Sequence, residues 1–213
     1  MAESDATRKY LVYGVEALQQ YFRHRSDVYV SGNLWVSYEE GVPEAAVCPD
    51  VFVVFEVEKR QRETYRVWEE NGKTPDWVLE VTSSITQQED EQDKPEIYSL
   101  IGVKEYFQYD PTGDYLNPLL KGRRLVDSRY QDMIPSRLFD GTVVFDSAVL
   151  GLKMQLLPDG RLRFLVPSGG EYLLTPGESE RERVRERERA NYEKERADRL
   201  AAKLIELGID PDL

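Results

Sequence analysis

The amino-acid sequence predicts an α/β (α+β) domain built on a mixed sheet, followed by a separate charged helix. Short apolar runs of strand length alternate with two stretches of helical periodicity in the order α-β-β-β-α-β, and hairpin-like strands follow them. Strands that flank a helix imply a mixed sheet with helices packed against it. Near its end the chain changes to a composition dominated by Glu and Arg, which is typical of an isolated helix.

The first predicted elements are a helix and a long strand. Apolar residues recur at helical spacing between Tyr10 and Phe22, after a polar start at Ser4. From Val28 to Tyr38 the residues alternate as in one strand, with Gly32 as a candidate bulge.

Three further strands and a second helix complete the predicted core. Residues 51–55 are a continuous apolar run, as expected of a strand covered on both faces, and 77–82 and 105–110 are similar. A helical pattern spans Gln87–Leu100, between the last two of these strands. A charged stretch, Lys59–Lys73, separates the first two.

The last third of the chain predicts hairpins and then a long helix. The clearest hairpin pairs 152–156 with 162–166 around Pro158-Asp159-Gly160. Glu178–Arg199 contains eight acidic and eight basic residues, and no Pro or Gly. We therefore predict a compact domain in residues 1–176 and a charged C-terminal helix in residues 177–213.

Sparse apolar residues in this helix suggest a short coiled coil of about two heptads. Seven residues separate successive members of two sets: Ala190, Ala197 and Leu204, and also Leu200 and Leu207. A single solvated helix explains the same pattern equally well, so both interpretations stay open.

Composition excludes several classes of protein. A chain of 213 residues with 40% hydrophobic residues has enough apolar material for one folded domain with an appendage, which excludes general disorder. The single histidine, His24, excludes chemistry that needs two imidazoles from one chain, such as HExxH zinc peptidases. We expect no membrane span and no organic cofactor. The absence of a leader-like start predicts a cytoplasmic location.

The net charge of −12 bears on nucleic-acid binding. Duplex DNA is a dense polyanion, so a strongly acidic chain binds it poorly without help. Any DNA binding must be concentrated on a basic face, screened by cations or supported by oligomerisation.

Two acidic residues occupy positions where burial is expected. Asp50 precedes the apolar run 51–55, and Glu80 lies inside the strand 77–82, where alternation places it on the same face as Val78. A buried carboxylate is costly unless it is paired or binds a metal. If the two strands are neighbours, the carboxylates emerge at one end of the sheet and supply the usual protein share of a Mg²⁺ site. The alternatives are a turn residue or a helix-cap partner for Asp50, and a solvent-facing strand position for Glu80.

Lys94 is the third candidate, since it lies near the start of the helix that follows the Glu80 strand. Its ammonium could orient a nucleophilic water or balance phosphate charge. The alternative is a solvated surface lysine.

These residues carry a resemblance to a known family. Pro49-Asp50 before one strand and Glu80-Val81-Thr82 in the next resemble the PD-(D/E)XK nuclease superfamily, with its restriction endonuclease-like fold. The sequence is most similar to the bacterial "Uma-two" family of "putative restriction endonucleases". The similar segments are CPDVFVVFEVEKR, YRVWEENGKTPDWVLEVTSSIT and DKPEIYSLIGVKEYFQYDP, within about residues 28–111, and the terminal LAAKLIELGIDPD.

The resemblance implies a DNA endonuclease that hydrolyses phosphodiester bonds with Mg²⁺ (or Mn²⁺), and we expect it to act as a homodimer. It assigns metal binding to the side chains of Asp50 and Glu80 and to the backbone carbonyl of Val81. Two related functions share this fold: a catalytically inactive scaffold or interaction protein, and a structure-selective DNA-repair nuclease.

One position departs from the superfamily pattern. The superfamily lysine is expected two residues after Glu80, where this chain has Thr82. The resembling family supplies the lysine from the following helix, and Lys94 matches that place. Glu16, on the first helix, matches an acid that some superfamily members use as an additional metal ligand; a surface helix residue is the alternative.

Two basic segments are candidates for DNA contacts. Residues 59–66 follow the Asp50 strand, and residues 121–124 occupy a later hairpin-like turn. Either segment could touch backbone phosphates, which position DNA without reading its sequence. A solvated charged loop is the alternative for each. The candidate DNA-binding residues are Lys59, Arg60, Arg62, Arg66, Arg123 and Arg124.

Overall fold

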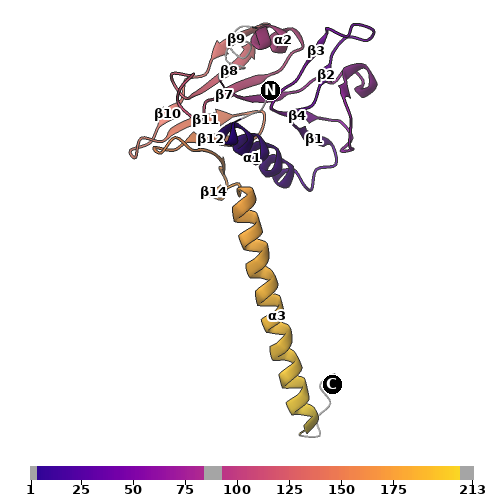
Figure 1. The fold of residues 1–213 in the computed structure, drawn as a ribbon, viewed down its shortest axis with the longest axis vertical. Coiled ribbons are helices and arrows are strands. Elements are labelled where there is room, and N and C mark those ends of the chain that lie inside the picture. Colours follow the sequence, from indigo (N-terminus) through magenta and orange to yellow (C-terminus); the bar gives the residue numbers. More distant parts are fainter. Residues whose placement is uncertain (1–3, 84–92, 207–213) are drawn as a thin grey trace. The chain divides into compact units, whose positions relative to one another are not determined.

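The computed structural model describes residues 4–83 and 93–206 of the chain (Figure 1). The chain divides into two compact units, Met1–Leu173 and Leu174–Leu213. In the first unit the helices are α1 (Asp5–Tyr21), the 3₁₀ helix η1 (Val67–Glu70) and α2 (Lys94–Leu100). Its strands are β1 (Val28–Ser31), β2 (Val36–Ser37), β3 (Ala46–Val47), β4 (Val51–Phe55), β5 (Tyr65–Arg66), β6 (Trp77–Val81), β7 (Glu105–Tyr109), β8 (Leu120–Val126), β9 (Arg129–Asp132), β10 (Ser136–Arg137), β11 (Val143–Ser147), β12 (Leu152–Leu156), β13 (Leu162–Val166) and β14 (Glu171–Tyr172).

A six-stranded mixed sheet with the order β1-β4-β6-β7-β8-β9 forms the centre of this unit. β6 and β7 are parallel, and the other neighbouring pairs are antiparallel. Helix α2 lies between β6 and β7 along the chain, as expected of a parallel crossover. Counting only the α-helices and the strands of this sheet, the chain runs α1-β1-β4-β6-α2-β7 up to β7, which confirms the predicted core order.

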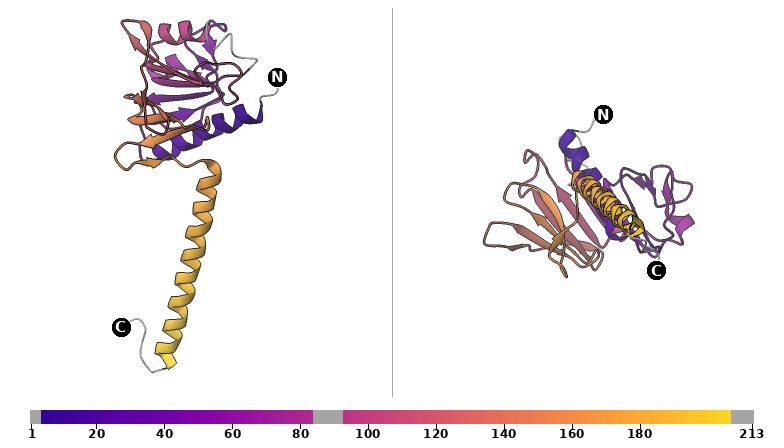
Figure 2. Two further views of the ribbon diagram at one scale, coloured as in Figure 1. Left: turned by 90° about the vertical axis from the view of Figure 1, so that its left-hand side faces the viewer. Right: turned by 90° about the horizontal axis from the view of Figure 1, so that it is seen from below.

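Both faces of the central sheet are covered, which explains why its strands are almost continuously apolar. One face, which includes Trp77 and Leu79, packs against Leu18 of α1 and Phe164 of β13 in one hydrophobic cluster. β13 belongs to a five-stranded sheet with the order β10-β11-β12-β13-β14. The predicted hairpin is present in it as β12 and β13, with Leu156 opposite Leu162. Figure 2 shows the five-stranded sheet and α1 from two further sides.

The opposite face of the central sheet packs against α2 and a small three-stranded sheet, β3-β2-β5. Its hydrophobic cluster includes Phe52 of β4, Val78 of β6, Tyr98 of α2 and Tyr65 of β5. Because side chains alternate along a strand, Glu80 lies on this face together with Val78. The predicted division of 77–82 between two faces is therefore confirmed.

The prediction of one strand from Val28 to Tyr38 is wrong. β1 ends at Ser31 and pairs with β4 in the central sheet, whereas β2 belongs to the three-stranded sheet. Asn33, between them, has a positive φ of 49°, so the chain turns there. Gly32 marks this break and is not a bulge within one strand. The charged stretch Lys59–Lys73 contains β5 and η1.

The described part of the second predicted helix begins at Lys94. Residues 87–92 of that prediction lie outside the described residues.

The second unit contains α3 (Pro176–Glu206), a helix of 31 residues with no buried residue. Thr175 and Glu178 form a capping box at its start: the Thr175 N–H donates to Glu178 Oε2 at 2.8 Å, and the Glu178 N–H donates to Thr175 Oγ1 at 3.3 Å. Leu207 and Gly208 lie outside the described residues, so the coiled-coil seam stays a prediction. None of the helices in the described ranges combines the length and the apolar character needed to span a membrane.

Candidate metal centre

Asp50 and Glu80 lie side by side at one end of the central sheet. β4 and β6 are antiparallel with Val51 opposite Leu79, so the start of β4 lies beside the end of β6. The Val81 N–H donates to Asp50 Oδ2 at 2.7 Å, and the Asp50 N–H approaches Glu80 Oε2 at 3.4 Å. The two carboxylates, 30 residues apart in sequence, are therefore held by backbone groups at each other's strand ends.

Two glycines permit the close packing that places Asp50. A Cβ atom on Gly32 would lie 2.0 Å from the Asp50 carbonyl oxygen, and one on Gly14 of α1 would lie 2.8 Å from Val51 Cγ2. Real Cβ atoms do not approach backbone this closely, so any side chain at Gly32 would displace the start of β4. The physical role of Gly32 is thus to let the end of β1 pass directly beside Asp50.

Glu80 is fully buried and its carboxylate is held by groups from α2. Its side chain is 0% exposed, and Lys94 Nζ lies 2.8 Å from Glu80 Oε2, with 11% of the lysine side chain exposed. The Tyr98 hydroxyl donates to Glu80 Oε1. A buried carboxylate needs both a counter-charge and hydrogen bonds to offset its loss of hydration, and α2 supplies both.

Sequence reasoning missed Tyr98. Lys94 and Tyr98 are four residues apart, which places them on one face of α2, and both reach the same carboxylate. The spacing Lys-x-x-x-Tyr was visible in the sequence. Tyr98 is completely buried, so its hydroxyl must find a polar partner, and that requirement was the available signal.

Thr82 occupies the position where the superfamily lysine is expected. It is 1% exposed, and its Oγ1 has no hydrogen-bond partner in the described part of the chain. Because it is two residues beyond Glu80, it faces the same side of the sheet. Lys94 of α2, which was predicted to replace that lysine, contacts Glu80.

Thr82→Val tests whether this hydroxyl contributes to the fold. Valine keeps the branched shape and removes a buried hydroxyl without a described partner, so we expect the free energy of unfolding to stay unchanged or rise by up to about 1 kcal/mol. Urea unfolding of both proteins measures this. A loss of more than about 1 kcal/mol would mean that the hydroxyl has a stabilising partner.

A Mg²⁺ site in this region would draw on the oxygen atoms of Asp50 and Glu80. Mg²⁺ in proteins is commonly held by one or two carboxylates, with water and substrate phosphate completing its octahedral shell. Asp50 and Glu80 provide the carboxylates. Within residues 4–83 and 93–206, no group of three or more His, Cys, Asp and Glu side chains is arranged to hold a metal. A metal here would thus depend on oxygen atoms beyond the side chains, such as backbone carbonyls.

The Val81 carbonyl is suited to this role because of its neighbour across the sheet. Continuing the register beyond Val51 and Leu79 places Pro49 opposite Val81. Proline has no N–H and cannot donate to that carbonyl, while the Pro49 carbonyl accepts from the Asn33 N–H at 2.9 Å. We infer that Pro49 leaves the Val81 oxygen outside the β4–β6 ladder.

Glu16, the candidate ligand on the first helix, lies on the exposed side of α1. No contact between described residues connects its carboxylate with Asp50 or Glu80. The structure therefore gives Glu16 no described link to the other candidates.

The first basic segment folds into a structural ion cluster. Arg62, with its side chain 2% exposed, donates to both carboxylate oxygens of Glu70, at 2.8 and 2.9 Å, and its guanidinium lies 4.3 Å from the centre of the Tyr29 ring. The pKa of Glu70 is lowered, mainly because its carboxylate accepts hydrogen bonds from Arg62. Arg60 shares the same carboxylate at 2.5 Å. This burial removes Arg62 from the side chains that can reach a DNA phosphate.

The side chains of the other predicted DNA contacts are more exposed, but they do not all lie on the same side of the molecule. Lys59 is exposed, with Nζ 3.4 Å from the Phe22 carbonyl, and Arg66 is half exposed beside Glu69. Arg123 lies opposite Tyr106, on the sheet face that carries Glu80. Arg124 faces the other side, where it donates to buried Glu105 at 2.8 Å.

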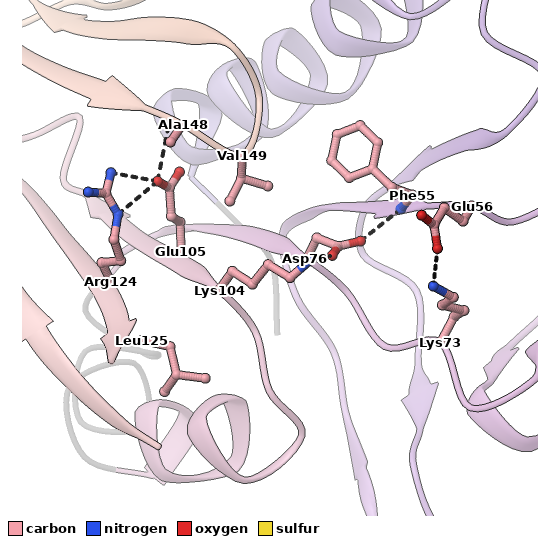
Figure 3. Close-up of a pocket in the computed structure, with 10 residues that line it drawn as sticks. All are labelled: Phe55, Glu56, Lys73, Asp76, Lys104, Glu105, Arg124, Leu125, Ala148 and Val149. Carbon is pink, nitrogen blue, oxygen red and sulfur yellow. Dashed lines mark hydrogen bonds and ion pairs between the residues drawn. The ribbon is translucent and has the colours of Figure 1, made fainter. Parts of the chain in front are cut away.

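A cavity of about 520 Å³ lies at the opposite end of the central sheet from Asp50 and Glu80. Ion pairs from strand ends line it: Lys73 with Glu56, Lys104 with Asp76, and Arg124 with Glu105 (Figure 3). Every charged side chain that lines this cavity has an opposite charge beside it, so the cavity walls are largely neutralised. It is separate from the candidate metal centre.

The core order and the placement of its two acids define a protein with the restriction endonuclease-like fold. The sequence model of the Uma2 family, described as "Putative restriction endonuclease", matches residues 6–147. Since this match spans more than half of the chain, the protein belongs to the Uma2 family.

Comparison with solved structures found a crystal structure of a protein from Anabaena variabilis ATCC 29413, titled a "putative nuclease belonging to DUF820". It is 12% identical, with a TM-score of 0.47, and the match covers 62% of this chain and 69% of that chain. This similarity is too low to support a conclusion about the function of this chain. A comparison with curated proteins found no match.

Proposed function

We propose that this protein is a Mg²⁺-dependent endonuclease that hydrolyses phosphodiester bonds of DNA, with Mn²⁺ as a substitute ion. The observation that supports this most is the meeting of Asp50, Glu80 and Lys94 at one end of the sheet. These groups come from three separate parts of the chain, and membership of the Uma2 family gives the site its chemical context.

In this proposal the Asp50 and Glu80 carboxylates and the Val81 carbonyl hold the cation. When bound, a divalent cation polarises a phosphate, neutralises charge on the leaving oxygen and activates water. Lys94 orients the attacking water and stabilises the negative charge that develops on the phosphate. Tyr98 keeps the Glu80 carboxylate turned toward the site.

Asp50→Asn is the direct test of this function. Purified wild-type protein is expected to nick supercoiled plasmid DNA with Mg²⁺ or Mn²⁺, and not when the ions are chelated. Asp50→Asn is expected to reduce nicking to the chelated level, because a neutral amide is a much poorer ligand for a hard cation. Asn can still accept the Val81 N–H, so the fold should be retained.

Asp114→Asn makes the same chemical change at an exposed loop position and serves as the matched control. Full nicking by Asp50→Asn, or nicking by the wild type with all divalent ions chelated, would contradict the proposal.

A catalytically inactive nuclease-fold scaffold is the second candidate, and Thr82 is the observation that favours it. The superfamily lysine is missing from its usual strand position. Calorimetric titration with Mg²⁺ and Mn²⁺ separates the two functions: the endonuclease binds at least one of the ions through Asp50 and Glu80, and Asp50→Asn lowers that affinity. Absence of ion binding at millimolar concentrations would favour the scaffold.

A further inference from the structure

The candidate metal centre continues as a row of polar side chains across the central sheet. Glu80 of β6 lies opposite Gln108 of β7, and Gln108 lies opposite Lys121 of β8. Residues directly opposite each other on paired strands point to the same face. Asp50, which lies beside Glu80, begins the row, and Lys121 ends it.

Neighbouring residues show on which face of the sheet this row lies. Arg123, two residues beyond Lys121 and therefore on the same face, has its guanidinium 6.0 Å from the centre of the Tyr106 ring. Tyr106 belongs to the hydrophobic cluster that also contains Tyr98 and Val78. Lys121 thus shares the face on which α2 and Glu80 lie.

The row changes from negative to positive along its length. Neighbouring strands are about 4.8 Å apart, so the Cα atom of Lys121 lies roughly 10 Å from that of Glu80. Between them stands Gln108, a neutral residue that is 1% exposed, whereas Lys121 is partly exposed. A long lysine side chain at this distance can meet a polyanion without entering the metal ligand set.

The positive charge of Lys121 counteracts the electrostatic repulsion between this acidic protein and DNA. The protein has a net charge of −12, and two carboxylates at the site repel a phosphate. A DNA strand that presents one phosphate to Asp50 and Glu80 has further phosphates on either side of it. Of the two arginines predicted to contact DNA from β8, Arg124 is engaged on the opposite face.

We propose that Lys121 binds a backbone phosphate of the DNA strand, next to the phosphate presented to Asp50 and Glu80. Lys121 is then a positioning residue that fixes the direction of the strand across β6, β7 and β8. This assignment rests on the proposed nuclease function, because it takes DNA as the ligand. It adds a phosphate contact outside the metal site.

The salt dependence of DNA binding tests Lys121 specifically. Affinity of the full chain for a fluorescent duplex oligonucleotide is measured by anisotropy at several salt concentrations, with Ca²⁺ present and the oligonucleotide checked for integrity. Each phosphate neutralised contributes about 0.9 to the slope of log K against log salt. We expect Lys121→Gln to weaken binding and to lower the magnitude of this slope by about one, and Lys121→Arg to keep the wild-type slope.

Lys153→Gln removes the same charge from β12, where Lys153 pairs with exposed Asp146 at 2.9 Å, and is expected to leave the slope unchanged. A wild-type slope in Lys121→Gln would overturn the assignment of Lys121 alone. A wild-type chain that binds no DNA under any of these conditions would overturn the proposed function as well. Unfolding curves in urea show whether each variant is folded, and a misfolded Lys121→Gln is replaced by Lys121→Met, which must give the same reduction in slope.

Discussion

Lys94→Met is expected to lower the free energy of unfolding by about 3–5 kcal/mol and to abolish DNA cleavage. Lys94 Nζ lies 2.8 Å from Glu80 Oε2, and the Glu80 side chain is 0% exposed. Removing one partner of a buried ion pair leaves an uncompensated charge in a region of low polarity, which is the costly case. Cleavage is lost because the same ammonium is proposed to orient the attacking water.

Urea unfolding measures the stability change, and Lys153→Met is the matched control. Lys153 forms an exposed pair with Asp146, with 36% and 68% of the two side chains accessible, so its loss should cost no more than about 1 kcal/mol. The double variant Lys94→Met with Glu80→Gln removes both charges and should recover most of the lost stability. Equal stability of Lys94→Met and the control would show that the Lys94–Glu80 pair does not support the fold.

The parts of the fold that could be predicted are those encoded by local periodicity. Strands covered on both faces, such as 51–55, give continuous apolar runs, and the core order follows from them. Glu80 stood out because a carboxylate inside such a run needs a specific partner. That argument depends only on neighbouring residues, and it led to the region where the structure places Asp50 and Lys94.

What could not be predicted depends on strand register and tertiary packing. The basic segment 121–124 was a candidate for DNA contacts, but the sequence could not show which of its side chains faces the metal centre, because the pairing of β7 with β8 places Lys121 opposite Gln108. Arg62 appeared as part of a basic surface segment, whereas Tyr29 and Glu70 from other parts of the chain bury it. The break in the first predicted strand has a similar cause, because the end of β1 meets the backbone at the start of β4, a contact between distant parts of the chain.

Asp110→Asn is expected to lower the free energy of unfolding at neutral pH by about 2–6 kcal/mol. The buried Asp110 carboxylate accepts hydrogen bonds from the Thr112 and Gly113 N–H groups at Oδ1 and from the Tyr115 and Leu116 N–H groups at Oδ2, over 2.6–3.0 Å. An asparagine turns an NH₂ group toward two of these donors and leaves them without an acceptor, at about 1–3 kcal/mol each. Asp114→Asn, at an exposed position of the same loop, should change stability by no more than about 0.5 kcal/mol.

The same substitution should alter the response of stability to acid. Burial acts to raise the pKa of Asp110, but the backbone hydrogen bonds of Tyr115, Leu116 and Thr112 outweigh it, so the pKa is lowered. Because the folded state binds this proton less readily than the unfolded state, the carboxylate stabilises the fold above the unfolded pKa of about 3.9 and loses that effect as pH falls through the folded pKa. The stability gap between wild type and Asp110→Asn, measured by urea unfolding from neutral pH downward, should therefore be constant above about pH 5 and narrow below about pH 4. A gap that stays constant down to the lowest pH at which both proteins fold would mean that Asp110 is not the ionised acceptor described here.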